Sequence, residues 1–258
     1  MSSSASPILT ATDGPVTTVT LNRPDKRNAL NTDLLGALVA AITAAESDKT
    51  QRILVLRGAG PVFCSGLDLD EAAQPGRAHA SAELVAQALR TIAATRLITI
   101  AAVQGAAIAG GAGLMSACDF AVATRDAKFG YPEVRRGLVP ALIMTFLRRQ
   151  LRERDARELL LLGKLFDATH AHTIGLINRV VADEAALTTE VRTLISSLLQ
   201  GGPEAVAGTK QLLTALWPTP VPADLDHALA FHLDARNSTE AKEGVAAFRE
   251  KRPPNWAP

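Results

Sequence analysis

The chain has 258 residues, which is enough for one large domain or for one domain with an appended segment, and its 47% hydrophobic content is ample for a buried core. Its 27 basic and 26 acidic residues leave a net charge of +1. This balance argues against nucleic acid or an anionic membrane as the main partner.

The first half of the chain alternates strand-like and helix-like segments. Two segments of alternating polarity flank Asp13-Gly14 and predict an opening β-hairpin. Asn31 or Thr32 is the expected N-cap of the first helix. The pattern predicts strands at residues 8–12, 16–21, 52–57, 98–103 and 120–123, helices at 31–47, 81–95 and 110–118, and a loop at 71–76.

After Pro140 the sequence is mainly helical. Helical periodicity covers residues 141–151, 155–162, 185–200, 203–216, 225–237 and 240–249, with a brief strand at 177–181 and a Pro-rich break at 217–222. The order of elements predicts an α/β core of strand–turn–helix units over residues 1–200. A helical C-terminal region is expected over residues 201–258.

One uncharged stretch, from Ile98 to Cys118, approaches the length of a membrane span. It contains four glycines and much alanine, whereas a bilayer span is normally richer in Leu, Ile and Val. A buried strand, a glycine turn and a buried helix explain the stretch better, so no membrane partner is expected.

The remaining compositional signals indicate a cytoplasmic protein. Residues 1–7 lack the basic-then-apolar pattern of a signal peptide. Cys64 and Cys118 have no metal-type spacing around them and are typical of a reducing compartment. We therefore expect no bound metal, and we interpret both cysteines as core thiols.

Two turns rich in small residues carry the main functional signal. The first contains Ser65, Gly66 and Leu67, and the second leads into a helix that begins at Gly110. Backbone amides approach a ligand closely only where side chains are absent or turned away, and the first amides of a helix have no partner within it. The amides of Leu67 and Gly110, converging on one carbonyl oxygen, would stabilise an enolate or a tetrahedral oxyanion. The alternative is two tight turns needed only for packing.

Glu133 is the candidate acid–base group. A proline fixes the backbone just before it, and Tyr131 with apolar neighbours is expected to desolvate its carboxylate and raise its pKa. The alternative, which spacing alone favours, is a surface glutamate paired with Arg135 or Arg136. Glu83, on the predicted helix at 81–95, is a further candidate for the same pocket.

An ordered set of segments spans nearly the whole chain. These segments are Leu21-Asn22-Arg23-Pro24 with Asn28-Ala29-Leu30, Phe63-Cys64-Ser65-Gly66-Leu67-Asp68, Gly105 with Gly110-Gly111, Cys118-Asp119, Phe129 to Glu133 with Gly137-Leu138-Val139-Pro140, Gly175-Leu176-Ile177, Thr209-Lys210, and Phe248 to Pro253. In these residues the chain resembles the crotonase superfamily, the enoyl-CoA hydratase/isomerase family. Each segment alone is weakly specific, and the resemblance depends on their order.

The resemblance implies a spiral of ββα repeats whose helical C-terminal region closes the CoA pocket and assembles a homotrimer or a dimer of trimers. It implies an acyl-CoA thioester substrate from fatty acid metabolism, with coenzyme A as part of the substrate and no further cofactor. The thioester carbonyl would accept from the amides of Leu67 and Gly110. The resemblance places around this ester Arg23, Lys26, Ala29, Ser65, Gly66, Asp68, Gly111, Gly113, Phe248 and Lys251.

The sequence departs from the family pattern at one position. Typical hydratases carry two glutamates; Glu133 matches the second, and Gly113 stands in place of the first. We predict hydration of a 2-enoyl-CoA with Glu133 as general acid and base. The alternatives are a double-bond isomerase that works with one glutamate, or an acyl-CoA-binding protein that has lost catalysis. A nucleotide-binding enzyme is disfavoured, because neither the P-loop pattern nor the G-x-G-x-x-G order is present.

Overall fold

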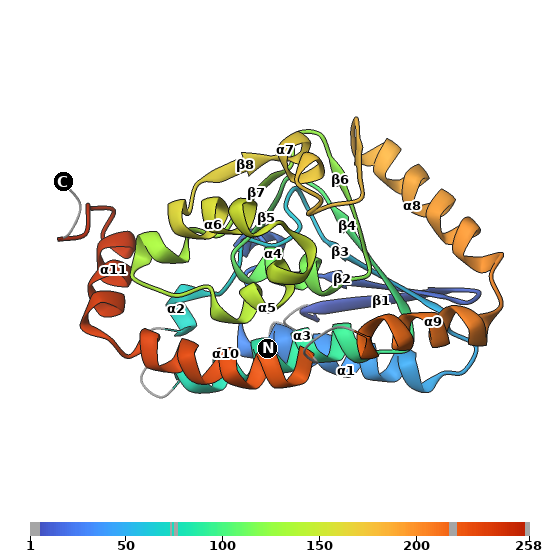
Figure 1. Cartoon of the computed structure of the whole chain (residues 1–258), viewed down its shortest axis with the longest axis horizontal. Coiled ribbons are helices and arrows are strands. Elements are labelled where there is room, and N and C mark those ends of the chain that lie inside the picture. The colour runs from blue at the N-terminus through green and yellow to red at the C-terminus, as the bar shows by residue number, and fades with distance from the viewer. Residues whose placement is uncertain (1–5, 73, 75–76, 217–220, 256–258) are drawn as a thin grey trace, which may run out of the picture.

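Apolar strands pair into a six-stranded sheet that is parallel except for its opening hairpin (Figure 1). The computed structural model describes residues 6–72, 74, 77–216 and 221–255. In spatial order the strands are β1 (Ile8–Asp13), β2 (Val16–Leu21), β3 (Ile53–Gly58), β4 (Ile98–Val103), β6 (Phe120–Thr124) and β9 (Arg179–Val181).

A second, smaller sheet contains β5 (Ala106–Ile108), β7 (Lys128–Gly130) and β8 (Leu165–Asp167). Isolated parallel bridges between Cys64 and Ala107 and between Leu30 and Leu67 continue it toward the N-terminal part of the chain. The chain therefore passes from a strand of the large sheet to a position in the small sheet and then into a helix. This confirms the predicted succession of ββα turns.

Successive side chains along a strand point to opposite faces of the large sheet, so the hydrophobic core is divided between its two faces. On β3, Leu54 and Leu56 belong to the cluster covered by α1 (Thr32–Ser47) and α3 (Arg77–Ala94). Ile53 and Val55 belong to the cluster on the opposite face, under α8 (Glu184–Leu199). Both faces are buried, as is typical of parallel sheets.

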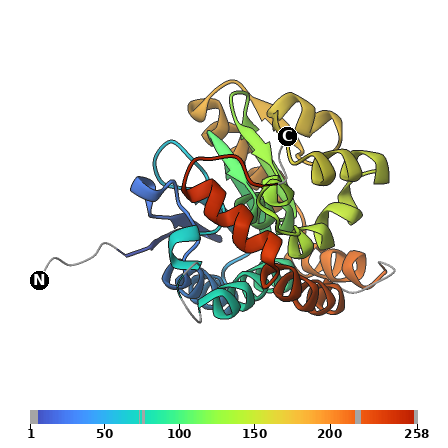
Figure 2. The same ribbon diagram turned by 90° about the vertical axis from the view of Figure 1, so that its left-hand side faces the viewer.

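The C-terminal helices α10 and α11 pack on other helical elements. Helix α10 packs against α3 and α5, and α11 packs against η2 and lies across the end of the molecule in Figure 2. The helical elements not yet given are η1 (Pro24–Lys26), α2 (Leu69–Ala72), α4 (Gly110–Ala117), η2 (Pro132–Arg136), α5 (Ala141–Gln150), α6 (Glu153–Leu162), α7 (Ala168–Thr173), α9 (Pro203–Ala215), α10 (Val221–Arg236) and α11 (Thr239–Arg249).

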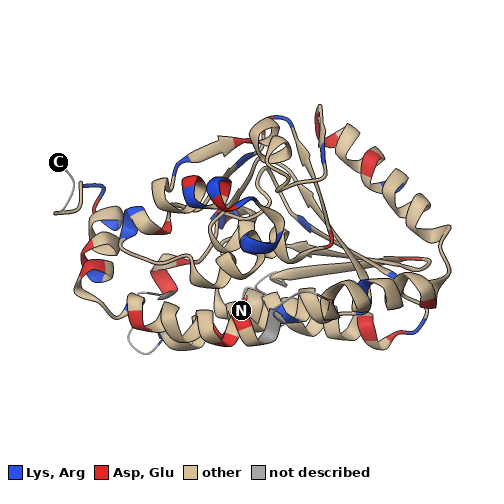
Figure 3. Cartoon of the chain, viewed as in Figure 1, with Lys and Arg blue, Asp and Glu red and all other residues tan. Residues whose placement is uncertain are grey.

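Charge lies mainly on the outer helices, where both signs intermix, and the strands of the large sheet carry little of it (Figure 3). None of the helices in the described part of the chain combines the length and apolar character that a membrane crossing requires.

Some helices and loops begin or end at other residues than predicted, because contacts with residues far away in the sequence set these boundaries. Asn31 is the N-cap of α1, because its side chain accepts from the amide of Leu34 at 3.0 Å. The predicted loop at 71–76 is wrong at its start: Glu71 lies in α2, where its carboxylate accepts from Thr32 N and Oγ1 at 2.8 and 2.6 Å. Residues 73, 75 and 76 of that loop, and residues 217–220 of the Pro-rich break, lie outside the described residues.

Other differences concern short elements. Helix α3 begins at Arg77 instead of Ser81, and β9 begins only at Arg179. The sequence pattern left β5, β7, β8 and α7 unassigned. Elements of three to six residues have too few positions to establish a hydrophobic period, so tertiary pairing decides them.

The two glycine turns touch each other at Gly111, which generates a test. A Cβ on Gly111 would lie 2.7 Å from Cys64 Cβ and 2.8 Å from Cys64 Sγ. We expect Gly111→Ala to lower the free energy of unfolding by about 1–3 kcal/mol through overpacking. Gly36→Ala is the matched control, because no atom lies within 4 Å of its added Cβ and the change favours helix α1 by about 0.5–1 kcal/mol. Urea denaturation of both variants measures this, and wild-type stability of Gly111→Ala would contradict the close contact.

Candidate active site

The two glycine turns are neighbours because they continue paired positions of the small sheet. Cys64 and Ala107 form a parallel bridge in which the amide of Ile108 donates to Cys64 O at 3.0 Å. Leu67 and Gly110 each follow a member of this pair by three residues. The turns remain in contact beyond this bridge, because a Cβ on Gly110 would lie 3.9 Å from Leu67 N.

The backbone at both turns leaves these amides open to the solvent side. Gly66 has φ +94°, and a Cβ there would lie 3.5 Å from Gly110 N and 3.0 Å from Ala109 Cβ. Ala109, the N-cap of α4, has φ +48°, a conformation that costs an L-residue energy and that clusters at functional sites. Among the hydrogen bonds of the described residues, none is donated by the amide of Leu67 or of Gly110. The pair can donate to one oxygen from outside the protein.

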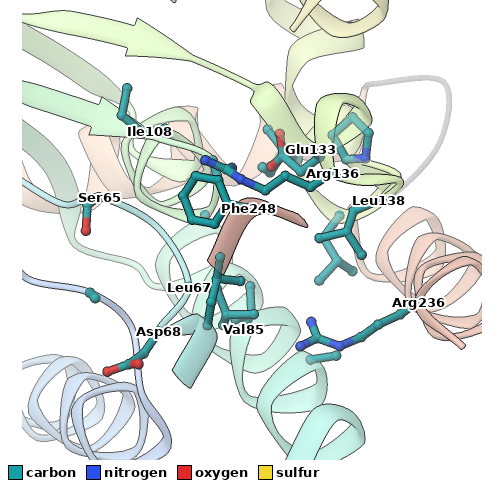
Figure 4. A pocket seen from close by; sticks show the side chains of 18 of the residues that line it. Ser65, Leu67, Asp68, Val85, Ile108, Glu133, Arg136, Leu138, Arg236 and Phe248 are labelled. Atoms are coloured by element: carbon teal, nitrogen blue, oxygen red, sulfur yellow. The ribbon is translucent and has the colours of Figure 1, made fainter. Parts of the chain in front are cut away.

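Leu67 and Gly110 both line a cavity of about 860 Å³. Figure 4 shows the side chains of Leu67, Glu133 and Phe248 around it. The sequence-predicted residues that line it are Lys26, Ala29, Ser65, Leu67, Asp68, Gly110, Glu133, Phe248 and Lys251. Segments from η1, the first turn, α4, η2 and α11 thus meet at one site.

Four predicted residues lie outside this lining and support it. Arg23 pairs with Asp68 at 3.0 Å and also donates to the carbonyl of Ala29, so it holds two lining residues in place. Gly66 and Gly111 are the points at which the turns approach each other. Gly113 is buried in α4.

Glu133 is buried in η2 with an exposed fraction of 9%, which excludes the alternative of a surface glutamate. Its Oε2 has no hydrogen-bond partner in the described part of the protein. Burial raises the pKa of Glu133 to about 7, and the nearby positive charge of Arg136 acts in the opposite direction. Arg135 is turned elsewhere, because its Nε donates to Leu162 O at 3.0 Å. A carboxyl group with this pKa can both accept and return a proton near neutral pH.

Arg136 connects Glu133 to the C-terminal helix. Its guanidinium carbon lies 4.1 Å from the centre of the Phe248 ring, a cation–π contact between η2 and α11. Burial lowers the pKa of Arg136, and the Glu133 carboxylate opposes that shift. In the sequence, Arg136 is only a candidate ion-pair partner of a surface glutamate, and the tertiary structure places it in the cavity lining.

Apolar side chains occupy the surroundings of Gly113. A Cβ at this position would lie 3.1 Å from Ile143 Cγ1 and 3.7 Å from Leu89 Cδ2. Ile143 is 4% exposed and belongs to the cavity lining. At the position where the two-glutamate pattern places a carboxylate, this protein therefore has a glycine next to the apolar side chains of Ile143 and Leu89.

The other sequence candidates lie away from the cavity. Glu83 and His79 form an exposed ion pair at 3.1 Å, outside the lining. Cys64 and Cys118 are buried thiols whose pKa is raised by burial to about 12, as expected for core cysteines. The lining residues that were not predicted from the sequence include Arg136, Ile143, His232 and Arg236. No local sequence signal distinguishes them from ordinary helix residues.

Comparison with known proteins establishes the family. The sequence model of the enoyl-CoA hydratase/isomerase family matches residues 11–258. Enoyl-CoA hydratase EchA19 of Mycobacterium tuberculosis is 36% identical over 92% of this chain and 91% of its own, and a crotonyl-CoA hydratase of Syntrophomonas wolfei is 34% identical over 92% of each. An enoyl-CoA hydratase structure from Mycobacterium avium has a TM-score of 0.86 at 36% identity, covering 98% of this chain and 100% of its own.

The protein has the crotonase fold and belongs to the enoyl-CoA hydratase/isomerase family. Membership implies an enzyme whose substrate is an acyl-CoA thioester.

The pKa of Glu133 provides a direct test of the site. We expect its carboxyl group to titrate near pH 7 and Arg136→Met to move this value upward, because the variant removes the positive charge that lowers it. Arg135→Met is the control, since that side chain points away and should leave the titration unchanged. Infrared difference spectroscopy of the carboxylate band against pH, with Glu133→Gln to assign the band, gives the values. Titration of Glu133 near 4.5 would contradict the buried environment.

Proposed function

We propose that the protein adds water to a 2-enoyl-CoA thioester, with Glu133 as general acid and base and with the amides of Leu67 and Gly110 as the oxyanion hole. The observation that carries the proposal is the presence, in one cavity, of a buried carboxyl group of pKa about 7 and two amides without a protein acceptor. Family membership and the crotonyl-CoA hydratase relative support it.

In this reaction the thioester oxygen accepts hydrogen bonds from the amides of Leu67 and Gly110. Glu133 takes a proton from water while the water oxygen forms a bond to the β-carbon. The π electrons of the double bond move toward the thioester, and the negative charge develops on the oxygen of an enolate. Protonated Glu133 then delivers its proton to the α-carbon, and the carbonyl is restored. Loss of one oxyanion donor from such a site typically costs a factor of about 10²–10³ in rate.

Basic residues at the mouth of the cavity suit the phosphates of coenzyme A. Lys26 and Arg27 approach from η1, and Arg249 and Lys251 from α11 and the turn that follows it. The exposed ring of Phe248 adds an apolar surface beside them. Guanidinium and ammonium groups are the usual partners of phosphate oxygens. We assign coenzyme A to this side as part of the substrate.

Glu133→Gln tests the proposed acid–base role. We expect the variant to hydrate 2-enoyl-CoA esters about 10²–10⁴-fold more slowly, because the amide cannot transfer the proton, while a saturated acyl-CoA binds as in the wild type. Glu83→Gln is the matched control, since Glu83 is exposed and outside the lining. Loss of enone absorbance measures turnover. An unchanged rate in Glu133→Gln would remove Glu133 from the mechanism, and binding of esters without turnover by the wild type would indicate a binding protein.

The apolar wall around Gly113 favours a second candidate function, isomerisation of a 3-enoyl-CoA to the 2-enoyl ester. Glu133 would remove a proton from the α-carbon and return it to the γ-carbon, with the same enolate held by the same amides. This reaction needs no second carboxylate to orient water, and Ile143 fills the neighbourhood of the position where a hydratase would place one.

Restoring the missing carboxylate separates these two functions. Because Ile143 obstructs a side chain at position 113, we expect Gly113→Glu combined with Ile143→Ala to raise crotonyl-CoA hydration about tenfold or more, and Gly113→Glu alone to raise it less. Rates on matched 2-enoyl and 3-enoyl esters are the measurement, with Ile143→Ala alone as the control. No gain in any variant would mean that water is held by a different arrangement.

We also propose that residues 201–258 assemble the protein into a homotrimer or a dimer of trimers. Large apolar side chains are exposed on the last helices, namely Leu212, Leu213, Leu216, Phe231 and Phe248. Exposed apolar surface of this kind is typical of subunit interfaces.

A further inference from the structure

The element that carries Glu133 is short and lies between two helices. η2 is a 3₁₀ helix of five residues. Helices of this type have poorer hydrogen-bond geometry than α-helices and run for only a few residues. Both α6 and α11 pack against η2. The place of the Glu133 carboxyl group therefore depends on how these two helices hold η2.

Helix α6 holds the residues on either side of the glutamate. A Cβ on Gly163, which ends α6, would lie 3.3 Å from Pro132 Cα and 3.0 Å from Val134 Cγ2. Arg135 Nε donates to Leu162 O at 3.0 Å. These contacts hold one side of η2.

Helix α11 holds the last residue of η2 at both its backbone and its side chain. A Cβ on Gly244 would lie 2.3 Å from the carbonyl carbon and oxygen of Arg136. The Phe248 ring lies 4.1 Å from the guanidinium carbon of the same arginine. A Cβ on Gly137, the C-cap of η2, would lie 2.5 Å from Glu240 O. Residues 240, 244 and 248 are four apart, so one face of α11 makes all three contacts.

The contact at Gly244 leaves no space for a side chain. A real Cβ at 2.3 Å from a backbone carbonyl would force the helix and η2 apart. Ala241 and Ala247, which flank this residue on α11, are each 1% exposed, so the helix is seated closely. The glycine therefore sets the distance between α11 and the backbone of Arg136.

The charges around Glu133 show how α11 can act on it. Arg136 is the charged residue that acts on the pKa of Glu133, and the phenol of Tyr131 is neutral because burial raises its pKa. Among the described residues, charged side chains of α6 and α11 form ion pairs with other groups, namely Arg157 with Glu153, Glu243 with Arg252, and Arg249 with Asp70. Helix α11 thus reaches the carboxyl group through Arg136 and through the exclusion of water from η2.

We infer that α11 positions Glu133 for the reaction by holding Arg136 between Gly244 and Phe248. Gly244 and Phe248 are then positioning residues, because they act on the reacting carbons only through η2. This inference rests on the proposed role of Glu133 in hydration, and it adds the part of the chain that places the carboxyl group.

A binding surface is the competing role for α11. Phe248, Arg249 and Lys251 line the cavity, and a helix that serves only to bind the substrate would affect KM when it is disturbed. A helix that positions Glu133 affects kcat and the titration of the carboxyl group. The two roles therefore differ in measurable quantities.

Gly244→Ala is the main test. We expect it to lower kcat on 2-enoyl-CoA esters by about tenfold to a hundredfold and to change KM by less than about threefold, because a small displacement of a reacting group is costly in rate. The infrared titration of Glu133 should move to lower pH, because separation of α11 from η2 lets water reach the carboxylate. Since the reaction begins with the carboxylate form, the rise of kcat with pH moves to lower pH as well.

Gly208→Ala is the matched control in the same C-terminal region. Gly208 lies in α9, and no atom lies within 4 Å of its added Cβ, so kcat and the titration should stay at wild-type values. Urea denaturation establishes that both variants are folded. Partial unfolding of Gly244→Ala would reduce the amount of active enzyme without moving the pH at which the folded fraction titrates.

Phe248→Leu tests the side-chain contact in a variant that leaves the helix backbone unchanged. The ring is 50% exposed, so its replacement leaves no buried cavity. We expect kcat to fall about threefold to tenfold in the wild-type background and less than about twofold in Arg136→Met, where the contact is already absent. Equal losses in both backgrounds would mean that Phe248 acts without Arg136 and would overturn the inference, whether or not Gly244→Ala folds.

The titration separates this inference from the hydration reaction, since it needs no turnover. If no ester turns over, the proposed function fails, and a lower titration of Glu133 in Gly244→Ala still supports the positioning by α11. Wild-type kcat and titration in a folded Gly244→Ala, or a rise in KM alone, would overturn the inference and leave the hydratase function standing.

Discussion

The parallel pairing of Cys64 with Ala107 is the interaction on which the rest of the site depends. It brings two turns that are far apart in the sequence into one register, and the same offset of three residues places Leu67 beside Gly110. The contact leaves no space for side chains at the crossing, which explains why glycines occupy both turns. An oxyanion hole built from amides of this kind needs no reorganisation when charge develops.

The pKa of Glu133, the proposed acid–base group, depends on a balance between burial and one charge. η2 carries Glu133 into the cavity wall, where loss of water raises its pKa, and Arg136 on the same turn limits the rise. The stacking of Arg136 on Phe248 links this balance to the C-terminal helix. The helical C-terminal region, which we propose serves assembly, is therefore also linked to the environment of the Glu133 carboxyl group.

The cavity lining combines basic and apolar side chains. Its basic residues include Lys26, Arg27, Arg249 and Lys251, and its apolar residues include Leu142 and Ile143. Basic groups suit the phosphates of coenzyme A, and apolar side chains suit the carbon chain of an acyl group. The apolar surroundings of Gly113 adjoin this lining through Ile143.

The sequence by itself determined the α/β core and the positions of the longer strands and helices, and it singled out the two amides and Glu133 as candidates. Each of these leaves a local sign, such as a hydrophobic period, a glycine turn after a strand or a proline beside an acidic residue. Only the tertiary structure decided the three-residue strands, the burial of Glu133, the apolar surroundings of Gly113 and the place of Arg236 in the cavity. These depend on contacts between segments far apart in the chain, and an arginine on a helix has the same local pattern whether it faces solvent or a cavity.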